Sequence, residues 1–172
     1  DWLSLGPQSV SHGDIRLDQF INSGSDLQFT LVDWEECGNR HLAYDPMCFV
    51  SDVFFNEFYK KITHSISRHD ISEELSDNSF DQNFYTSVHH IAKLWKILCS
   101  QNTSLLQFSD IVLDFLSIYC FDRLLAISST SMRLDAVGLA IAGIAIEVLD
   151  RTDEYSKFFL SEMKGINLAE EC

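Results

Sequence analysis

The clearest regularity in the chain is a helical repeat of apolar residues after Ser79. Steps of three and four residues separate the members of this repeat, which are Phe80, Phe84, Val88, Ile91, Trp95 and Leu98. Because 3.6 residues complete each turn of an α-helix, this spacing places all six side chains on one face. The pattern therefore predicts an amphipathic helix whose apolar face packs against the protein core.

Other segments carry similar helix signals. Asp45 and Pro46 form a start signal, because Asp can cap free main-chain N–H groups and Pro is tolerated at the first helical position. Spacing and capping together predict helices over about residues 46–64, 110–127, 131–150 and 155–163, the last of them ending at Gly165. The segment 110–127 is apolar on nearly every side, which predicts a position in the middle of a bundle.

Two glycines interrupt the helix predicted over residues 131–150. Gly138 and Gly143 each cost about 1 kcal/mol relative to alanine in a helix interior. We therefore expect a neighbouring helix to approach closely at both positions.

Residues 1–45 lack the helical pattern. Glycines punctuate short apolar runs there, and the runs indicate only a brief helix over residues 15–21 and a strand over 27–32. Residues 65–78 are polar and charged, as in an exposed connection or a short surface helix. We expect an all-α fold, in which residues 46–172 form a compact helical bundle and residues 1–45 form an irregular N-terminal segment packed on it.

Size and charge narrow the class of protein. A chain of 172 residues is long enough to build one hydrophobic core. Its 26 acidic and 12 basic residues give a formal net charge of -14. This charge repels nucleic-acid phosphates and anionic lipid surfaces, so we expect neither as a partner.

The sequence predicts no membrane span and indicates a reducing compartment. The longest apolar stretch, residues 136–146, is too short to cross a bilayer. Five cysteines show no close pairing, and Cys99 and Cys120 fall within helical apolar patterns, as buried thiols do. We expect an intracellular location, either cytoplasm or nucleus.

No residue pattern indicates a catalytic or metal site. His89 and His90 are adjacent and point about 100° apart on a helix, so they cannot easily face one ion. Cys37, His41 and Cys48 lack the paired spacing of a structural zinc site. We therefore expect no metal, no cofactor and no catalysis, with an enzyme that carries no familiar motif as the minority alternative.

One series of motifs resembles a known family. Residues 121–125 read Phe-Asp-Arg-Leu-Leu, residues 133–138 read Arg-Leu-Asp-Ala-Val-Gly, and an Ala-rich helix ends in Glu-Val-Leu-Asp at 147–150. The series resembles the first box of the cyclins, in which D-R-F-L, K-L-Q-L-V-G and K-F-E-E elements follow in that order. Trp95 falls where the family has the tryptophan of its D-W-L element. The resemblance covers about residues 84–164.

This resemblance implies a cyclin-like, non-catalytic domain that binds a protein, with a cyclin-dependent-type kinase as the implied partner and cell-cycle kinase regulation as the implied role. The structural positions that it implies are Trp95, Asp122, Arg123 and Gly138. The partner-binding positions that it implies are Arg133, Glu147, Asp150 and Arg151. Glu147 stands where the family has the lysine of K-F-E-E, and Asp150 stands at its second glutamate.

Two questions remain open on the residues alone. Asp122 and Arg123 interrupt an apolar helix, so they form either a paired polar clamp between helices or a helix end that reaches solvent. The strong acidity also fits a different class of protein, a small inhibitor or immunity-type protein that masks the basic active site of a nuclease.

Overall fold

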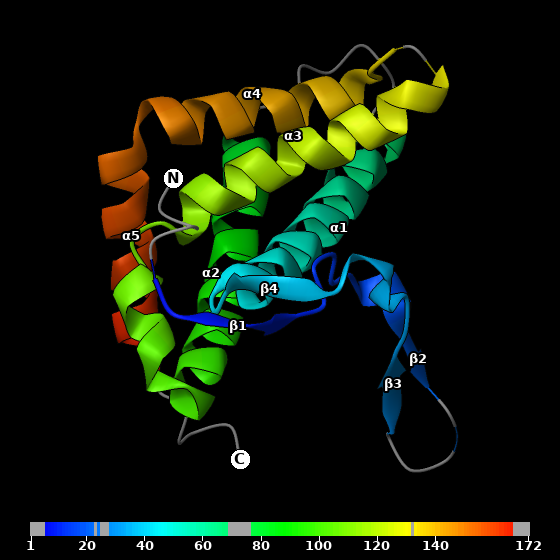
Figure 1. Ribbon diagram of the computed structural model, residues 1–172. Helices are drawn as coiled ribbons and strands as arrows, with labels where there is room; N and C mark the ends of the chain where they lie inside the picture. The colour runs from blue at the N-terminus through cyan, green and yellow to red at the C-terminus, as the bar shows by residue number, and fades with distance from the viewer. Residues whose placement is uncertain (1–5, 23, 25–27, 69–76, 132, 167–172) are drawn as a thin grey trace.

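A computed structural model describes residues 6–22, 24, 28–68, 77–131 and 133–166. Within these ranges the protein is mostly helical, which confirms the all-α character predicted from the sequence (Figure 1). The helices are, in chain order, α1 (Tyr44–Arg68), α2 (Asp77–Gln101), α3 (Val112–Ser131), α4 (Ala136–Asp150) and α5 (Thr152–Gly165). A 3₁₀ segment over Thr103–Phe108 lies between α2 and α3. None of the described helices is long and apolar enough to cross a membrane.

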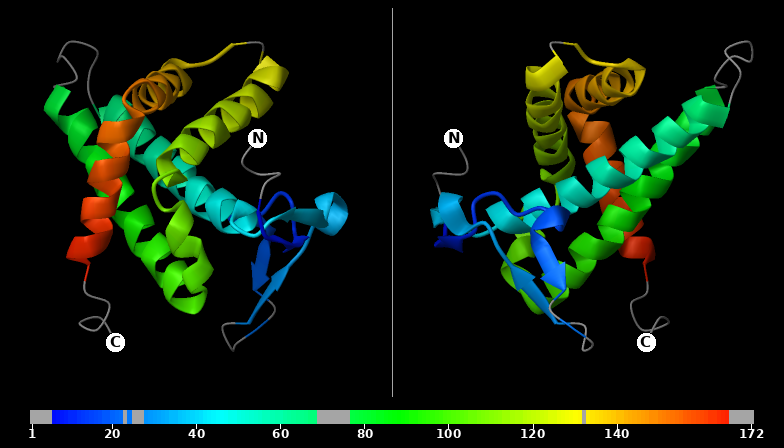
Figure 2. Two further views of the ribbon diagram at one scale, coloured as in Figure 1. Left: turned by 60° about the vertical axis from the view of Figure 1, so that its left-hand side comes forward. Right: turned by 90° about the vertical axis from the view of Figure 1, so that its right-hand side faces the viewer.

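The helices pack as two pairs and a final helix. α1 and α2 lie side by side, and α3 and α4 form a second pair that packs across α1 (Figures 1 and 2). α5 turns away from the end of α4 and runs along α2, where it also contacts α3. The core therefore lies where the two pairs cross.

The apolar face predicted for α2 is buried in this core. Phe84, Val88, Ile91 and Trp95 are each at most 4% exposed, and Trp95 is fully buried. The indole Nε1 of Trp95 donates a hydrogen bond to Ser109 Oγ at 2.9 Å, which satisfies its one polar atom. The 3.6-residue pattern thus identified both the helix and its buried side.

The segment before α1 contains short strands that the sequence pattern only partly predicts. β1 (Gln8–Ser11) pairs antiparallel with β4 (Gly38–His41), and β2 (Phe20–Asn22) pairs antiparallel with β3 (Phe29–Leu31). The predicted strand over residues 27–32 is present as β3. The helix predicted over 15–21 is wrong, because only a 3₁₀ turn, Leu17–Gln19, forms before the chain enters β2. Figure 2 shows the β2–β3 pair projecting away from the helices.

Asp45 does not cap its own helix as predicted. α1 begins one residue earlier, at Tyr44. The Asp45 carboxylate instead accepts hydrogen bonds from Ser11 Oγ at 2.6 Å and from the main-chain N–H groups of His12 at 2.6 Å and Gly13 at 3.0 Å. Three donors from residues 11–13, at and just after the end of β1, contact one carboxylate, so Asp45 anchors the N-terminal segment to the helical body.

Several helix boundaries differ from the prediction. α1 continues to Arg68 and α2 starts at Asp77, so each residue of the predicted connection 65–78 is either helical or lies in 69–76, outside the described residues. α3 continues to Ser131, four residues past its predicted end. α4 starts at Ala136 rather than near 131, because the Asp135 side chain caps it by accepting from Gly138 N at 2.7 Å.

The two glycines of α4 have different surroundings. A Cβ on Gly138 would lie 3.2 Å from Leu134 Cδ2 and 3.4 Å from Leu124 Cδ2 of α3, so a close approach exists there. A Cβ on Gly143 would meet no atom within 4 Å. The expected close approach at Gly143 is therefore wrong, because Gly143 lies on the exposed side of α4.

Candidate protein-binding face

The outer side of α3 and α4 carries exposed apolar side chains. Ile118 and Leu125 of α3 are 60% and 68% exposed, and Leu139 and Ile146 of α4 are 61% and 58% exposed. The members of each pair are seven residues apart, close to two helical turns, so each pair forms a stripe along its helix. We call these four residues the α3–α4 face.

The two stripes lie next to each other. α3 and α4 run antiparallel and side by side (Figure 1), and Leu124 and Gly138 mark where they approach closely. Both residues are buried, whereas their chain neighbours Leu125 and Leu139 are exposed, at the same level of the pair. Leu125 and Leu139 therefore belong to one continuous patch rather than to two separate sides.

Acidic side chains lie on the same helices as this apolar patch. Asp122 of α3, Asp135 at the N-cap of α4, and Glu147 and Asp150 of α4 are all exposed. Asp122 lies one turn from both Ile118 and Leu125, so it interrupts the stripe on α3. The face thus combines exposed apolar side chains with acidic ones.

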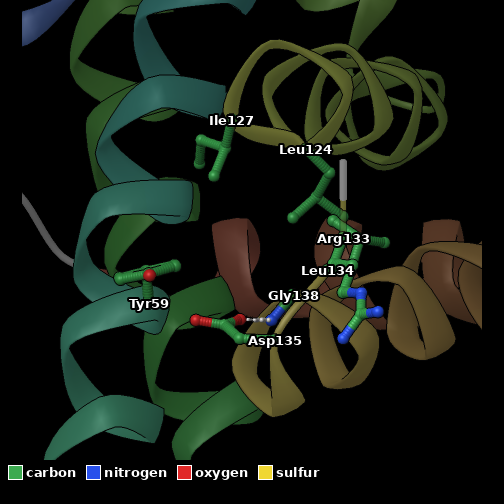
Figure 3. Close-up of a pocket in the computed structure, with 7 residues that line it drawn as sticks. All are labelled: Tyr59, Leu124, Ile127, Arg133, Leu134, Asp135 and Gly138. Atoms are coloured by element: carbon green, nitrogen blue, oxygen red, sulfur yellow. Dashed lines mark hydrogen bonds between the residues drawn. The ribbon is translucent and has the colours of Figure 1, made fainter. Parts of the chain in front are cut away.

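A groove opens at one end of the face (Figure 3). Its volume is about 540 Å³, and its lining consists of Tyr59, Leu124, Ile127, Arg133, Leu134, Asp135 and Gly138. Figure 3 shows Tyr59 of α1 across the groove from the capping contact between Asp135 and Gly138. Arg133 and Asp135 of this lining are exposed, whereas Leu124 of α3 and Leu134, just before α4, provide apolar walls.

The structure separates the four partner-binding positions that the resemblance implies. Arg133 borders the groove before α4 begins, and Glu147, Asp150 and Arg151 lie at the other end of the helix. α4 has 15 residues, which corresponds to a length of about 22 Å at 1.5 Å per residue. All four side chains are exposed, but only the last three form one neighbourhood.

Glu147 and Arg151 already contact each other in the isolated chain. Arg151 Nη1 donates to Glu147 Oε1 at 2.9 Å, and Arg151 Nη2 donates to Glu154 Oε2 at 2.6 Å. Tyr155 Oη donates to the same Glu147 oxygen at 2.9 Å. Burial, followed by the neighbouring Glu147, raises the pKa of Tyr155 above its usual value. A partner at this end of α4 therefore meets an organised charge cluster.

Two of the structural positions that the resemblance implies, Asp122 and Arg123, differ in their exposure to solvent. Asp122 is exposed and Arg123 is half-buried, and both lie in the middle of α3 rather than at its end. This arrangement is neither the paired buried clamp nor the solvent-reaching helix end that the sequence leaves open. Adjacent positions on a helix point about 100° apart, which explains how one side chain faces solvent while its neighbour faces the protein.

Two features of the structure, one on α3 and one on α1, are not evident from the sequence. The exposed positions Ile118 and Leu125 sit in a segment without polar periodicity, so the prediction that α3 is enclosed in the bundle is wrong. Asp52 is a buried carboxylate, 2% exposed, that accepts from Tyr119 Oη at 2.9 Å and Leu17 N at 2.8 Å. Its only sequence signal is an acidic residue among the apolar positions of a predicted helix.

The two adjacent histidines contact carboxylates of neighbouring helices, and the Cys120 thiol is buried. His89 Nδ1 lies 2.6 Å from Glu162 of α5, and His90 Nδ1 lies 2.9 Å from Glu57 of α1. Burial raises the pKa of the Cys120 thiol to about 12, which disfavours the reactive thiolate. In the ranges that the structure describes, no three His, Cys, Asp or Glu side chains gather as metal ligands would.

Comparison with known proteins adds no relative. No model of a known protein family matches the chain, and no curated protein is similar to it at a significant level.

Proposed function

We propose that this chain is a non-catalytic, cyclin-like protein-binding domain that docks an apolar segment of its partner on the α3–α4 face. The observation that supports it is the exposure of Ile118, Leu125, Leu139 and Ile146, each more than half accessible on two adjacent helices. Single exposed apolar residues are common on protein surfaces, but contiguous groups of them mark interaction sites.

The geometry of the face favours a helical partner segment. Two neighbouring apolar stripes can accept the apolar side of an amphipathic helix, whose anchors recur every three to four residues. Gly143, exposed between Leu139 and Ile146, has no side chain to keep such a helix at a distance. The acidic side chains on α3 and α4 favour Lys or Arg on that helix.

The resemblance to the first cyclin box supports a protein kinase as the partner. In that family a helix of the kinase meets the C-terminal end of the helix that corresponds to α4 here. Arg133 at one end of α4, and Glu147, Asp150 and Arg151 at the other, would then be the polar contacts around the apolar anchors. Kinase regulation in the cell cycle is the role that follows from this partner.

The test separates the face from the rest of the surface. Leu125→Gln and Ile146→Gln replace central anchors with polar side chains of similar size, and Val10→Gln makes the same kind of change on β1, where Val10 is exposed. Affinity for a cyclin-dependent-type kinase, measured by titration calorimetry, should fall at least about tenfold in both face variants and stay unchanged in the control. Equal affinity of the face variants and wild type would remove the face from the proposal.

The acidic inhibitor class is distinguished by salt. If the chain instead masks a basic nuclease, charge dominates the contact, and affinity for a basic nuclease should weaken steeply between low and physiological salt. Binding through the apolar anchors of the α3–α4 face should change little over the same range. The slope of affinity against salt therefore decides between the two classes.

A further inference from the structure

A second cavity lies between the N-terminal segment and the helical body. Its volume is about 290 Å³, and its lining consists of Leu17, Asp18, Asp52, Asn56, Lys60 and Arg123. This volume is at the lower end of the range of ligand pockets, which run from about 300 to 1,000 Å³. The cavity shares no lining residue with the groove or the α3–α4 face.

The acidic groups of this cavity already have donors. The two oxygens of Asp52 accept from Tyr119 Oη and from the main-chain N–H of Leu17. Asp18 accepts from Arg16 Nε at 3.0 Å in an exposed ion pair. Both carboxylates thus have hydrogen-bond donors within the protein itself, and Asp18 also has a cationic partner in Arg16.

The basic groups of the cavity, Arg123 and Lys60, retain the capacity to bind an anion. The Nε atom of Arg123 is buried and has no hydrogen-bond partner. Neither Arg123 nor Lys60 forms an ion pair with another residue of the described ranges. A buried donor without a partner is costly, and a bound water or ion is one way in which such a group is satisfied.

We propose that this cavity binds a small oxyanion, the phosphate or carboxylate group of a small molecule, between Arg123 and Lys60. The guanidinium of Arg123 supplies planar donors that match the oxygens of either group, and Lys60 adds a mobile positive charge at the cavity wall. Asn56, whose Nδ2 donates to the Asp52 main-chain carbonyl at 2.8 Å, leaves its amide oxygen for a hydroxyl on the same molecule. This site is independent of the proposed protein partner.

The cavity also connects the ligand to the N-terminal segment. Leu17 and Asp18 belong to the 3₁₀ turn before β2, Asn56 and Lys60 to α1, and Arg123 to α3. An oxyanion held by α1 and α3 would therefore lie next to the N-terminal segment where that segment packs on both helices. Anion binding should stabilise this packing against local opening, and it should also give Arg123 Nε an acceptor.

Titration with inorganic phosphate, sulfate and acetate tests the proposal. The full chain is titrated at constant ionic strength, balanced with sodium chloride, and the amide signals of residues 16–18 are followed by nuclear magnetic resonance. We expect saturable shifts with a dissociation constant in the roughly millimolar range, which is typical of one small charged group. Comparison of the three anions identifies which oxyanion the cavity prefers.

Matched variants locate the site. Arg123→Gln and Lys60→Gln should each weaken the preferred anion at least about tenfold, whereas Lys157→Gln removes the same charge from an exposed position on α5 and should leave affinity unchanged. If Arg123→Gln fails to fold, Lys60→Gln alone decides, because Lys60 is exposed. Absence of saturable shifts in wild type, or equal weakening by Lys60→Gln and Lys157→Gln, would overturn the proposal.

Discussion

Tyr119 and Asp52 share a hydrogen bond of 2.9 Å that links α3 to α1 inside the protein. The second oxygen of Asp52 accepts from the main-chain N–H of Leu17, so one carboxylate connects two helices and the N-terminal segment. Burying a carboxylate is unfavourable unless donors replace the water that it loses. Tyr119 therefore supplies one of the two hydrogen bonds that compensate for the desolvation of the Asp52 carboxylate.

Tyr119→Phe should destabilise the fold by about 1–3 kcal/mol, because it removes a donor from a buried carboxylate and leaves one oxygen without a partner. The free energy of unfolding, measured by urea denaturation, provides the check. Tyr85→Phe is the matched control, since Tyr85 is exposed on α2. Equal stability of the two variants would show that the Asp52 contact carries no net stabilisation.

The same tyrosine predicts a sensitivity to alkaline pH. Burial first, and then the charge of Asp52, raises the pKa of Tyr119 above its usual value of 10. Above pH 10 the unfolded chain can ionise this phenol while the folded chain resists, so its contribution is present below pH 10 and is lost as pH rises further. The free energy of unfolding should fall less between pH 10 and 12 in Tyr119→Phe than in wild type. Parallel curves would contradict this assignment.

The helices could be predicted from the sequence because a helix that buries one face repeats its apolar residues about every 3.6 positions. Trp95 and its companions on α2 lie among polar residues, so the buried face was visible in the pattern. Leu125 lies in an apolar segment, where the pattern cannot tell the covered side from the exposed side. Asp45 followed by Pro46 is a good helix-cap signal locally. Its carboxylate instead accepts from Ser11 at the end of β1 and from His12 and Gly13 after it, and only the tertiary fold reveals these donors.

Lys96 closes the C-terminal end of α5. Its Nζ donates to the main-chain carbonyls of Met163 at 2.7 Å and Ile166 at 2.5 Å, groups that otherwise lack partners at a helix end. Lys96→Met keeps most of the apolar stem and removes both bonds. It should cost about 1–2 kcal/mol in the free energy of unfolding and speed amide hydrogen exchange in the last turn of α5. Lys157→Met, at an exposed site of the same helix, should cost less than about 0.5 kcal/mol.

The two glycines of α4 should respond differently to alanine. Gly143→Ala should raise the free energy of unfolding by about 0.5–1 kcal/mol, because alanine favours the helix and its Cβ would meet nothing. In Gly138→Ala the new Cβ would press on Leu134 and Leu124, so most of that gain should be lost. Thermal denaturation of both variants makes the comparison. Equal stabilisation would mean that α3 and α4 are not closely packed at Gly138.

Glu147→Lys tests the kinase hypothesis at the end of α4. The change removes the contacts of Glu147 with Arg151 and Tyr155 and places two positive charges one turn apart. Because Glu147 and Arg151 are exposed and Arg151 keeps Glu154, the cost in stability should stay below about 1 kcal/mol. Circular dichroism and urea denaturation should therefore show an intact fold.

The effect on binding should be larger than the effect on folding. Lysine is the residue that the cyclin family carries at this point, so Glu147→Lys should strengthen binding to a cyclin-dependent-type kinase, by about tenfold if one charge-assisted contact forms. Asp153→Lys makes the same charge change at an exposed position near the start of α5 and should have less effect. Titration calorimetry near physiological salt compares wild type with both variants. Unchanged affinity in Glu147→Lys, or an equal gain in Asp153→Lys, would remove this end of α4 from the kinase-binding surface.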